Sequence, residues 1–217
     1  MAEPVKRGYR SELRATQAQD TRRRIVTAAA ELFVATGFGA TTVDAIAAAA
    51  GVSRKTVFTA AGGKVELLSL ALDWAIAGDD EPIALVDRPE VQALLRLRDP
   101  AAMLDDWARV LVGIDVRVAE LFVAMEAAAN LDPAARAVFD TSNDQRHQGA
   151  AVIVDAIASL GGLRRGLRRA AAVDIGWLLS DPVLYRRLVG DRAWTVARFE
   201  KWLAATLRHQ LLAGAEA

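Results

Sequence analysis

The chain has 217 residues, which is enough for one large or two modest domains that each bury an apolar core. Hydrophobic residues make up 53% of it and aromatic residues only 6%, and the abundance of Ala and Leu favours helices over sheets. The absence of cysteine excludes disulfides and thiolate metal sites, and only two histidines are present, His147 and His209. We therefore expect an all-α protein with no metal and no cofactor.

The net charge is zero, but the charges are unevenly distributed. Residues 1–64 contain ten Lys and Arg against five Asp and Glu, whereas the remaining 153 residues contain seventeen against twenty-two. A positive N-terminal region is what contact with nucleic-acid phosphates requires. The first residues lack the apolar core of a signal peptide, and no run of 18 apolar residues occurs. We expect a cytoplasmic protein with no membrane segment.

The N-terminal segment, residues 1–19, is basic because it contains Lys6, Arg7, Arg10 and Arg14. We predict a mobile arm that is either solvated or in contact with DNA. The first helix is expected to begin near Asp20 or Thr21 and to end at about Thr36, before Gly37. Its apolar stripe at helical spacing consists of Ile25, Ala28, Ala29, Leu32 and Phe33.

Two short helices separated by a glycine turn are predicted next. Thr42 can cap the N-terminus of a helix over Val43–Ala50, and Gly51 can adopt the left-handed conformation that often ends a helix. Ser53 can cap a second helix over Arg54–Thr59. This layout is typical of a helix-turn-helix that binds DNA.

Two adjacent cations, Arg54 and Lys55, begin the second of these helices. Positive charge in the first turn of a helix opposes the helix dipole by roughly a few tenths of a kcal/mol. The pair therefore suggests an anionic partner that outweighs this cost. The alternative is that both are ordinary surface charges on a solvated helix face.

The stretch of residues 20–70 resembles the TetR family of bacterial transcription regulators. The matching positions, in order, are Ile25, Ala28-Ala29, Leu32-Phe33, Gly37-Phe38, Thr41-Thr42, Ile46-Ala47, Ala50-Gly51-Val52-Ser53, Lys64 and Leu67. The resemblance implies a helix-turn-helix DNA-binding domain over residues 20–68 and a helical ligand-binding and dimerisation domain over residues 69–217. It further implies a homodimer that represses transcription at a palindromic double-stranded DNA operator until a small apolar or amphipathic effector releases it.

The same resemblance predicts the DNA contacts. Arg54, Lys55 and Thr56 would face base edges in the major groove, and the other members of the set would position the DNA backbone. The predicted set is Thr41, Thr42, Ser53, Arg54, Lys55, Thr56, Phe58, Thr59 and Lys64. Two departures from the family pattern affect phosphate contacts: Phe58 replaces a common Tyr, and Ala60-Ala61 replaces a common His-Phe.

The remainder of the chain is expected to be helical. A helix from Lys64 to about Ala77 would connect the two domains before the turn-forming residues 78–82. Further helices are predicted over about 88–98, 100–130, 133–162, 170–179, 182–189 and 195–213.

A polar stretch, Thr141–Gln148, interrupts the apolar pattern of one predicted helix. One interpretation is that this end of the helix is exposed, and another is that its side chains line a cavity between helices. Large apolar residues elsewhere in the body are either pocket walls or plain core. The predicted ligand contacts are Met103, Trp107, Phe122, Met125, Asn143, Asp144, His147 and Trp177.

The last predicted helix carries several large apolar side chains near the chain end. It resembles the closing helix of actinobacterial-type TetR proteins, in which the final helices pair with those of a second subunit. The predicted dimer contacts are Phe199, Trp202, Leu203, Thr206 and Gln210, and a core helix of a monomer is the alternative.

Two other functions compete with a ligand-responsive regulator. An all-helical enzyme is disfavoured because the chain has no Gly-x-Ser-x-Gly motif, no Gly-rich phosphate loop and no clear nucleophile–base pair. We expect no enzymatic activity. A DNA-binding protein without an inducer, whose body serves only to dimerise, fits the same sequence.

Overall fold

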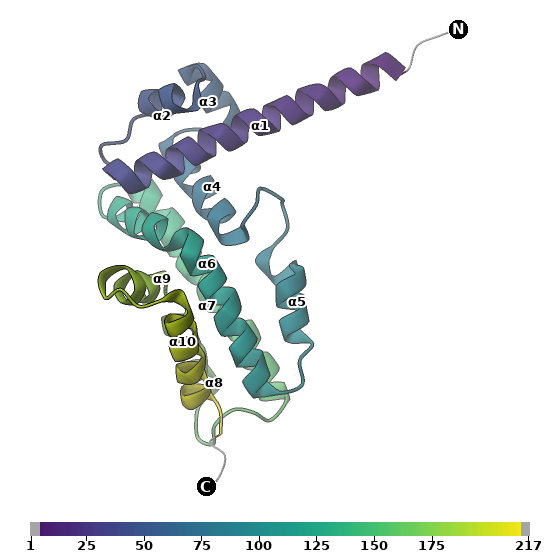
Figure 1. Cartoon of the computed structure of the whole chain (residues 1–217), viewed down its shortest axis with the longest axis vertical. Helices are drawn as coiled ribbons and strands as arrows, with labels where there is room; N and C mark the ends of the chain where they lie inside the picture. The colour runs from purple at the N-terminus through teal and green to yellow at the C-terminus, as the bar shows by residue number, and fades with distance from the viewer. Residues whose placement is uncertain (1–4, 214–217) are drawn as a thin grey trace. The chain divides into compact units, whose positions relative to one another are not determined.

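The computed structural model describes the backbone of residues 5–213 and the side chains of residues 14–213, and it confirms the all-helical prediction (Figure 1). No helix in this part of the chain is both long and apolar enough to cross a bilayer. The elements are α1 (Val5–Thr36), α2 (Val43–Ala50), α3 (Arg54–Ala61), α4 (Lys64–Ala77), η1 (Leu85–Asp87), α5 (Pro89–Leu95), α6 (Pro100–Ala129), α7 (Pro133–Ser159), α8 (Arg169–Leu179), α9 (Pro182–Tyr185), the π-helical η2 (Arg186–Asp191) and α10 (Val196–Leu211).

The chain divides into two compact units. Unit 1 contains the chain up to Trp74 together with Ala124–Val138, and unit 2 contains Ala75–Val123 together with the chain from Phe139 onward. The predicted boundary at residue 68 lies inside α4, whereas the contacts divide after Trp74. Hydrophobic periodicity identifies a helix but not the neighbour it packs against, so it gives no sign that the ends of α6 and α7 belong to unit 1.

The first helix begins earlier than predicted, at Val5 instead of Asp20. Residues 9–20 contain no Gly or Pro and are rich in good helix formers, so nothing ends the helix there. The Thr21 hydroxyl donates to the Gln17 carbonyl, 2.8 Å away, and therefore does not act as a helix cap. Arg14 is exposed, and the side chains of Lys6, Arg7 and Arg10 lie outside the described residues.

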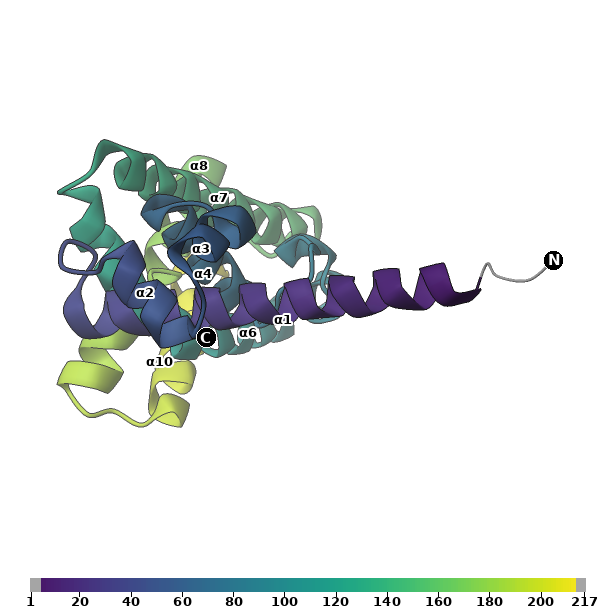
Figure 2. The same cartoon turned by 90° about the horizontal axis from the view of Figure 1, so that it is seen from above.

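Unit 1 is built around the C-terminal half of α1. Both α2 and α3 contact this helix, and two views show them lying beside it (Figures 1 and 2). Its core contains Phe33 packed on Phe38, with ring centroids 5.6 Å apart, and fully buried Ile46 and Val57 from α2 and α3. The apolar stripe predicted for α1 is this buried face, with only Leu32 partly exposed.

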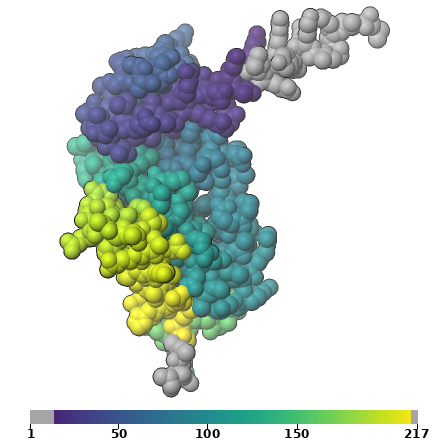
Figure 3. Space-filling view, in the orientation of Figure 1, coloured from purple at the N-terminus to yellow at the C-terminus, as the bar shows by residue number. Residues whose placement is uncertain are grey.

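Unit 2 is a helical bundle with one apolar core. The helices α6, α7, α8 and α10 all contribute buried side chains to it, among them Trp107, Ile157, Val173, Phe199 and Leu207. Figure 3 shows the surface of α10, in yellow, against that of α6, in teal. Burial of these side chains supplies the main stabilising free energy of this unit.

Two elements of unit 2 differ from the sequence prediction. The helix predicted over 88–98 is the shorter α5, because Arg88 is extended, 6% exposed, and bonded through both terminal nitrogens to the Asp79 carboxylate at 2.6 and 2.8 Å. The helix predicted over 182–189 is α9 followed by η2, whose Arg186 is paired with Asp191.

The predicted dimer contacts are partly wrong. Phe199 and Leu203 are fully buried in the core of their own unit, so they are unavailable to a second subunit. Trp202, Thr206 and Gln210 keep partial exposure. An amphipathic stripe has the same spacing whether it faces its own core or a partner, which is why the sequence did not separate these cases.

Two glycines of unit 2 provide a stability test. A methyl group at Gly162 would lie 2.6 Å from Cγ of the rigid Pro100 ring, whereas a methyl group at Gly113, inside α6, would have no neighbour within 4 Å. We expect Gly162→Ala to lower the free energy of unfolding by about 1–3 kcal/mol. The control Gly113→Ala should raise it by about 0.5–1 kcal/mol. Urea unfolding of both variants checks this, and equal stabilities would contradict the close approach at Gly162.

Candidate functional site

The helix-turn-helix forms through local contacts that match the predicted caps. The Thr42 hydroxyl accepts a bond from the Ala45 amide at 3.1 Å, and Gly51 is left-handed with φ of 65°. The Ser53 hydroxyl accepts a bond from the Thr56 amide at 3.1 Å, so α3 begins at Arg54 as predicted. It ends two residues later than predicted, at Ala61.

One face of α3 is buried and the opposite face is open. Val57 is fully buried, whereas Arg54, Lys55 and Thr59 are exposed and Phe58 retains 46% of its surface. The hydroxyl of Thr59 donates within the helix, to the carbonyls of Lys55 and Thr56. The open face therefore presents two cations and one aromatic ring.

Arg54 is held by two neighbours on this open face. Its guanidinium donates to the Asp44 carboxylate of α2 at 2.7 Å and lies 5.6 Å from the centroid of the Phe58 ring. Both charged side chains are more than half exposed, at 59% and 65%. Such exposed ion pairs contribute little stability, so the guanidinium is free to exchange Asp44 for another acceptor.

Thr41 is not a surface residue, which corrects its predicted role in contacting DNA. The residue is 2% exposed, and its hydroxyl lies 2.8 Å from the Gly37 carbonyl and 3.2 Å from that of Leu32. It fixes the turn between α1 and α2 instead. Because Thr41 and Thr42 are adjacent and chemically alike, only the structure shows that the first is internal and the second is an exposed cap.

Lys64 ties the start of α4 to the same turn. Its ammonium group donates to the Phe38 carbonyl at 2.8 Å and lies 4.1 Å from the centroid of the Phe38 ring. The predicted contact of Lys64 with a phosphate would have to compete with these two interactions.

The Ala60-Ala61 departure leaves open space beside α3. A hollow of about 430 Å³ is bordered by residues 59–62 together with Arg22 of α1 and Glu66, Ser69 and Leu70 of α4. Phe38 does not fill it, because this ring is buried against Phe33. The small side chains at positions 60 and 61 thus expose the end of α3.

The eight predicted ligand contacts do not come together. Met103 and Trp107 are packed in the core of unit 2, whereas Asp144 and His147 are exposed. Met125 is buried in unit 1. Phe122, Asn143 and Trp177 share a location around the side chain of Arg146, and the exposed His147 ring lies 6.4 Å from the Trp177 ring.

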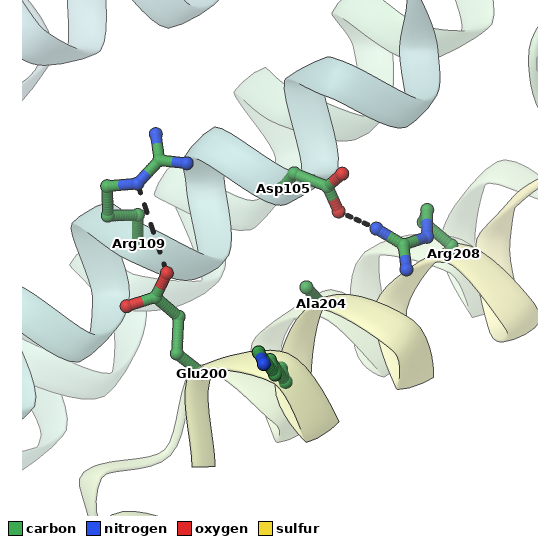
Figure 4. A pocket seen from close by; sticks show the side chains of 6 residues that line it. Asp105, Arg109, Glu200, Ala204 and Arg208 are labelled. Carbon is green, nitrogen blue, oxygen red and sulfur yellow. Dashed lines mark hydrogen bonds and ion pairs between the residues drawn. The ribbon is translucent and has the colours of Figure 1, made fainter. Parts of the chain in front are cut away.

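An open groove of about 420 Å³ lies between α6 and α10 and contains none of the predicted ligand contacts. Figure 4 shows Asp105 and Arg109 on one side and Glu200 and Arg208 on the other. Asp105 pairs with Arg208, and Arg109 lies 3.9 Å from Glu200. Its charges are therefore largely satisfied within the chain.

A buried polar cluster in unit 2 was missed by the sequence analysis. It comprises Asp115, Arg146, Trp177, Asp181 and Tyr185. The Arg146 guanidinium lies between two rings, 5.6 Å from the centroid of Phe122 and 5.3 Å from that of Trp177. It donates to the Trp177 carbonyl at 3.1 Å and to Asn143 at 2.7 Å, and is 3.5 Å from Asp181.

The cluster contains unusual buried groups. Asp115 is 3% exposed, and burial first, then the Asp181 carboxylate, raise its pKa to about 8 against the opposing effect of Arg146. Two buried donors, Nε of Arg146 and Nε1 of Trp177, have no hydrogen-bond partner. A mostly protonated carboxyl and two N–H groups without partners leave hydrogen-bonding capacity unsatisfied in this cluster.

The burial of Asp115 could have been predicted from the sequence. The residue lies on the helix face of Trp107, Leu111, Val118 and Phe122, at spacings of three and four, where every other residue is apolar. An acidic residue at a core position predicts a buried carboxyl. Its partner Arg146 is 31 residues away, and nothing local indicates that pairing.

Comparison with known proteins identifies the N-terminal domain. Residues 25–71 match the family described as bacterial regulatory proteins, tetR family. The HTH-type transcriptional regulator SrpR of Pseudomonas putida is 40% identical over 77 residues, which are 36% of this chain and 34% of that protein. The match thus spans about a third of the relative's length. Residues 25–71 therefore match the N-terminal domain of the tetR family of bacterial regulatory proteins.

Solved structures extend the likeness to the whole fold. A structure described as a transcriptional regulator from Saccharomonospora viridis in complex with choline has a TM-score of 0.67 and 20% identity, covering 89% of this chain and 98% of that one. The SmeT–triclosan complex has a TM-score of 0.64 and 19% identity, covering 90% and 93%. At these identities the likeness concerns the fold: a helix-turn-helix followed by a helical body.

Titration of Asp115 should be visible in the pH dependence of stability. The folded protein keeps a proton on this carboxyl that the unfolded chain releases above its ordinary pKa of 3.8. The stability from this group is therefore present at low pH and is lost as the pH rises towards 8. We expect Asp115→Asn to gain stability relative to wild type by up to about 1.4 kcal/mol per pH unit in this window. Urea unfolding between pH 4 and pH 9 measures it.

The control for this experiment is Asp144→Asn, which changes an exposed carboxylate on α7. Its stability should follow the wild-type pH profile. Parallel profiles for Asp115→Asn and wild type would mean that Asp115 is ionised in the folded protein.

Proposed function

We propose that the protein is a ligand-responsive transcriptional regulator that binds a palindromic operator as a homodimer and represses transcription until a small molecule releases it. The observation that supports DNA binding best is the open face of α3, where Arg54 and Lys55 are exposed on the second helix of the helix-turn-helix, within the residues that match the tetR family. Its work on DNA would place it in the cytoplasm.

The open face of α3 suits the major groove. The Arg54 guanidinium would leave Asp44 and bind the O6 and N7 acceptors of a guanine, an interaction worth about 1–3 kcal/mol of discrimination. Lys55 and Thr56 would contact neighbouring bases, while Thr42, Ser53 and Thr59 would position the backbone. Phe58 contributes apolar contact, since it has no hydroxyl for a phosphate.

The buried polar cluster is our candidate for the effector site. Two solved structures of similar fold are complexes, one with choline and one with triclosan, which supports the proposal that this chain binds a small molecule. Here the unpartnered N–H groups of Arg146 and Trp177 would donate to an oxygen of the effector, and Asp115 would bind one of its polar hydrogens or cationic groups. A ligand that binds one conformation of the body better than the other shifts the equilibrium between DNA-bound and free forms.

A dimer remains part of the proposal because a palindromic operator is matched by a two-fold axis. With Phe199 and Leu203 in the core, the remaining predicted contacts on α10 are Trp202, Thr206 and Gln210. The pairing of closing helices would follow the actinobacterial type. Selection of bound fragments from a random DNA pool tests both points, since a palindrome requires both DNA binding and two-fold symmetry.

Removal of the two exposed cations of α3 should weaken operator binding without unfolding the protein. We expect Arg54→Ala to reduce affinity for the selected operator by about 5- to 150-fold, because it loses about 1–3 kcal/mol of base contact. Lys55→Ala should also weaken it. The matched control is Arg192→Ala, an exposed cation of unit 2. Gel-shift titration measures affinity, and unchanged binding in both α3 variants would refute the assignment of α3 as the recognition helix.

Effector binding should raise the melting temperature of the protein by mass action. We expect at least one compound in a panel containing choline, triclosan and common metabolites to do so in the wild type. The increase should shrink in Trp177→Phe, which removes the indole N–H and keeps a smaller aromatic ring. If no compound raises the melting temperature while operator binding is intact, a regulator without an inducer is the better description.

A further inference from the structure

The loop between α7 and α8 carries the tripeptide Leu-Arg-Arg twice, at residues 163–165 and 167–169. Both leucines are partly buried and pack against the core of unit 2. All four arginines are exposed. We call Gly161–Arg168 the arginine loop. In the repeat, one partly buried leucine is followed by two exposed arginines.

The backbone of the arginine loop is fixed to the end of α10. The Arg164 amide donates to the Leu211 carbonyl at 2.9 Å, and the Ala213 amide donates to the Gly162 carbonyl at 3.3 Å. Leu163 and Leu212 form an antiparallel bridge. The guanidinium groups therefore project from an ordered backbone, which reduces the entropy lost when they bind a partner.

Three of the four arginines have no ion pair among the described residues, namely Arg164, Arg165 and Arg168. Arg169 differs, because it binds the Asp155 carboxylate through two nitrogens at 2.6 and 2.7 Å. No Asp or Glu occurs between Asp155 and Asp174. The three cations thus form a positive patch in a part of the chain, residues 65–217, whose net charge is −5.

Helix stability does not explain this patch. Cations at the N-terminus of a helix oppose its dipole, and Arg168 at the N-cap of α8 makes no capping bond with its side chain. Burial does not explain it either, since the side chains are exposed. An external polyanion would account for cations that are both exposed and unpaired.

We propose that the arginine loop is a second DNA-contacting surface, which binds phosphates without reading sequence. Guanidinium groups match the geometry of phosphate and bind it through two nitrogens. Three of them within five residues suit a polymer with regularly spaced phosphates. The choice of DNA as the polyanion rests on the proposed function, because a DNA-binding protein works at a high local concentration of phosphate.

The test uses the full chain and a duplex without an operator. In a background of Arg54→Ala and Lys55→Ala, binding is measured by fluorescence anisotropy from 20 to 200 mM salt. Substituting Arg164, Arg165 and Arg168 together by Gln should reduce the slope of log K against log salt by about 2 to 3, at about 0.9 for each lost phosphate contact. The corresponding Lys substitutions should preserve the slope.

The matched control removes three exposed cations elsewhere in unit 2, through Arg187→Gln, Arg192→Gln and Lys201→Gln. It changes the net charge equally and should alter the slope by less than about 1. Thermal melting confirms that both triple variants fold. Equal slopes in the two triples, or no duplex binding at 20 mM salt, would overturn the proposal.

A membrane is the competing polyanion. If the arginine-to-glutamine triple leaves the duplex slope unchanged but loses binding to phosphatidylglycerol vesicles, the arginine loop is a lipid contact and the DNA assignment is overturned. Failure of the proposed function would be seen separately, as unchanged operator affinity in Arg54→Ala and Lys55→Ala. The two proposals therefore fail in different measurements.

Discussion

The position of α3, the proposed recognition helix, depends on the turn between α1 and α2. Lys64 binds the Phe38 carbonyl from the start of α4, and the buried Thr41 hydroxyl reaches the Gly37 carbonyl from inside the turn. Both acceptors are carbonyls of the turn itself, just beyond the end of α1 at Thr36. They connect α1, α2 and α4 at one point, so that α3 is presented by a fixed frame. The position of Arg54 therefore depends on side chains that lie outside the open face of α3.

The buried polar cluster of unit 2, in contrast, lowers the stability of the fold. Burial of Asp115 and Arg146 costs free energy that apolar residues of similar size would not cost. The hydrogen bonds of Arg146 offset only part of that cost, since its Nε and the indole nitrogen of Trp177 remain unpaired. A molecule that completes these bonds would stabilise one arrangement of α6, α7 and α8 over others. In the proposed regulator, the same bundle would combine a stable apolar core with a site that responds to a ligand.

The sequence predicted what local chemistry determines. The bounds of α2, the start of α3 and both their caps follow from residues within four positions of each other, such as Ser53 and Thr56. The sequence did not predict contacts that depend on residues far apart in the chain. The Arg146–Trp177 contact spans 31 residues, and the burial of Phe199 depends on four helices meeting. Thr41 shows the limit within the motif itself, since its neighbour Thr42 has the same chemistry and the opposite exposure.

The pairing of Arg54 with Asp44 has a consequence for wrong DNA sequences. In the proposed complex, a guanine that draws the Arg54 guanidinium away from Asp44 would leave this carboxylate unneutralised near phosphates. A guanine acceptor compensates for this repulsion, whereas a base without a suitable acceptor does not. Asp44 thereby penalises contacts with non-operator DNA. The acidic residue of α2 would contribute to selectivity by opposing binding, without touching a base.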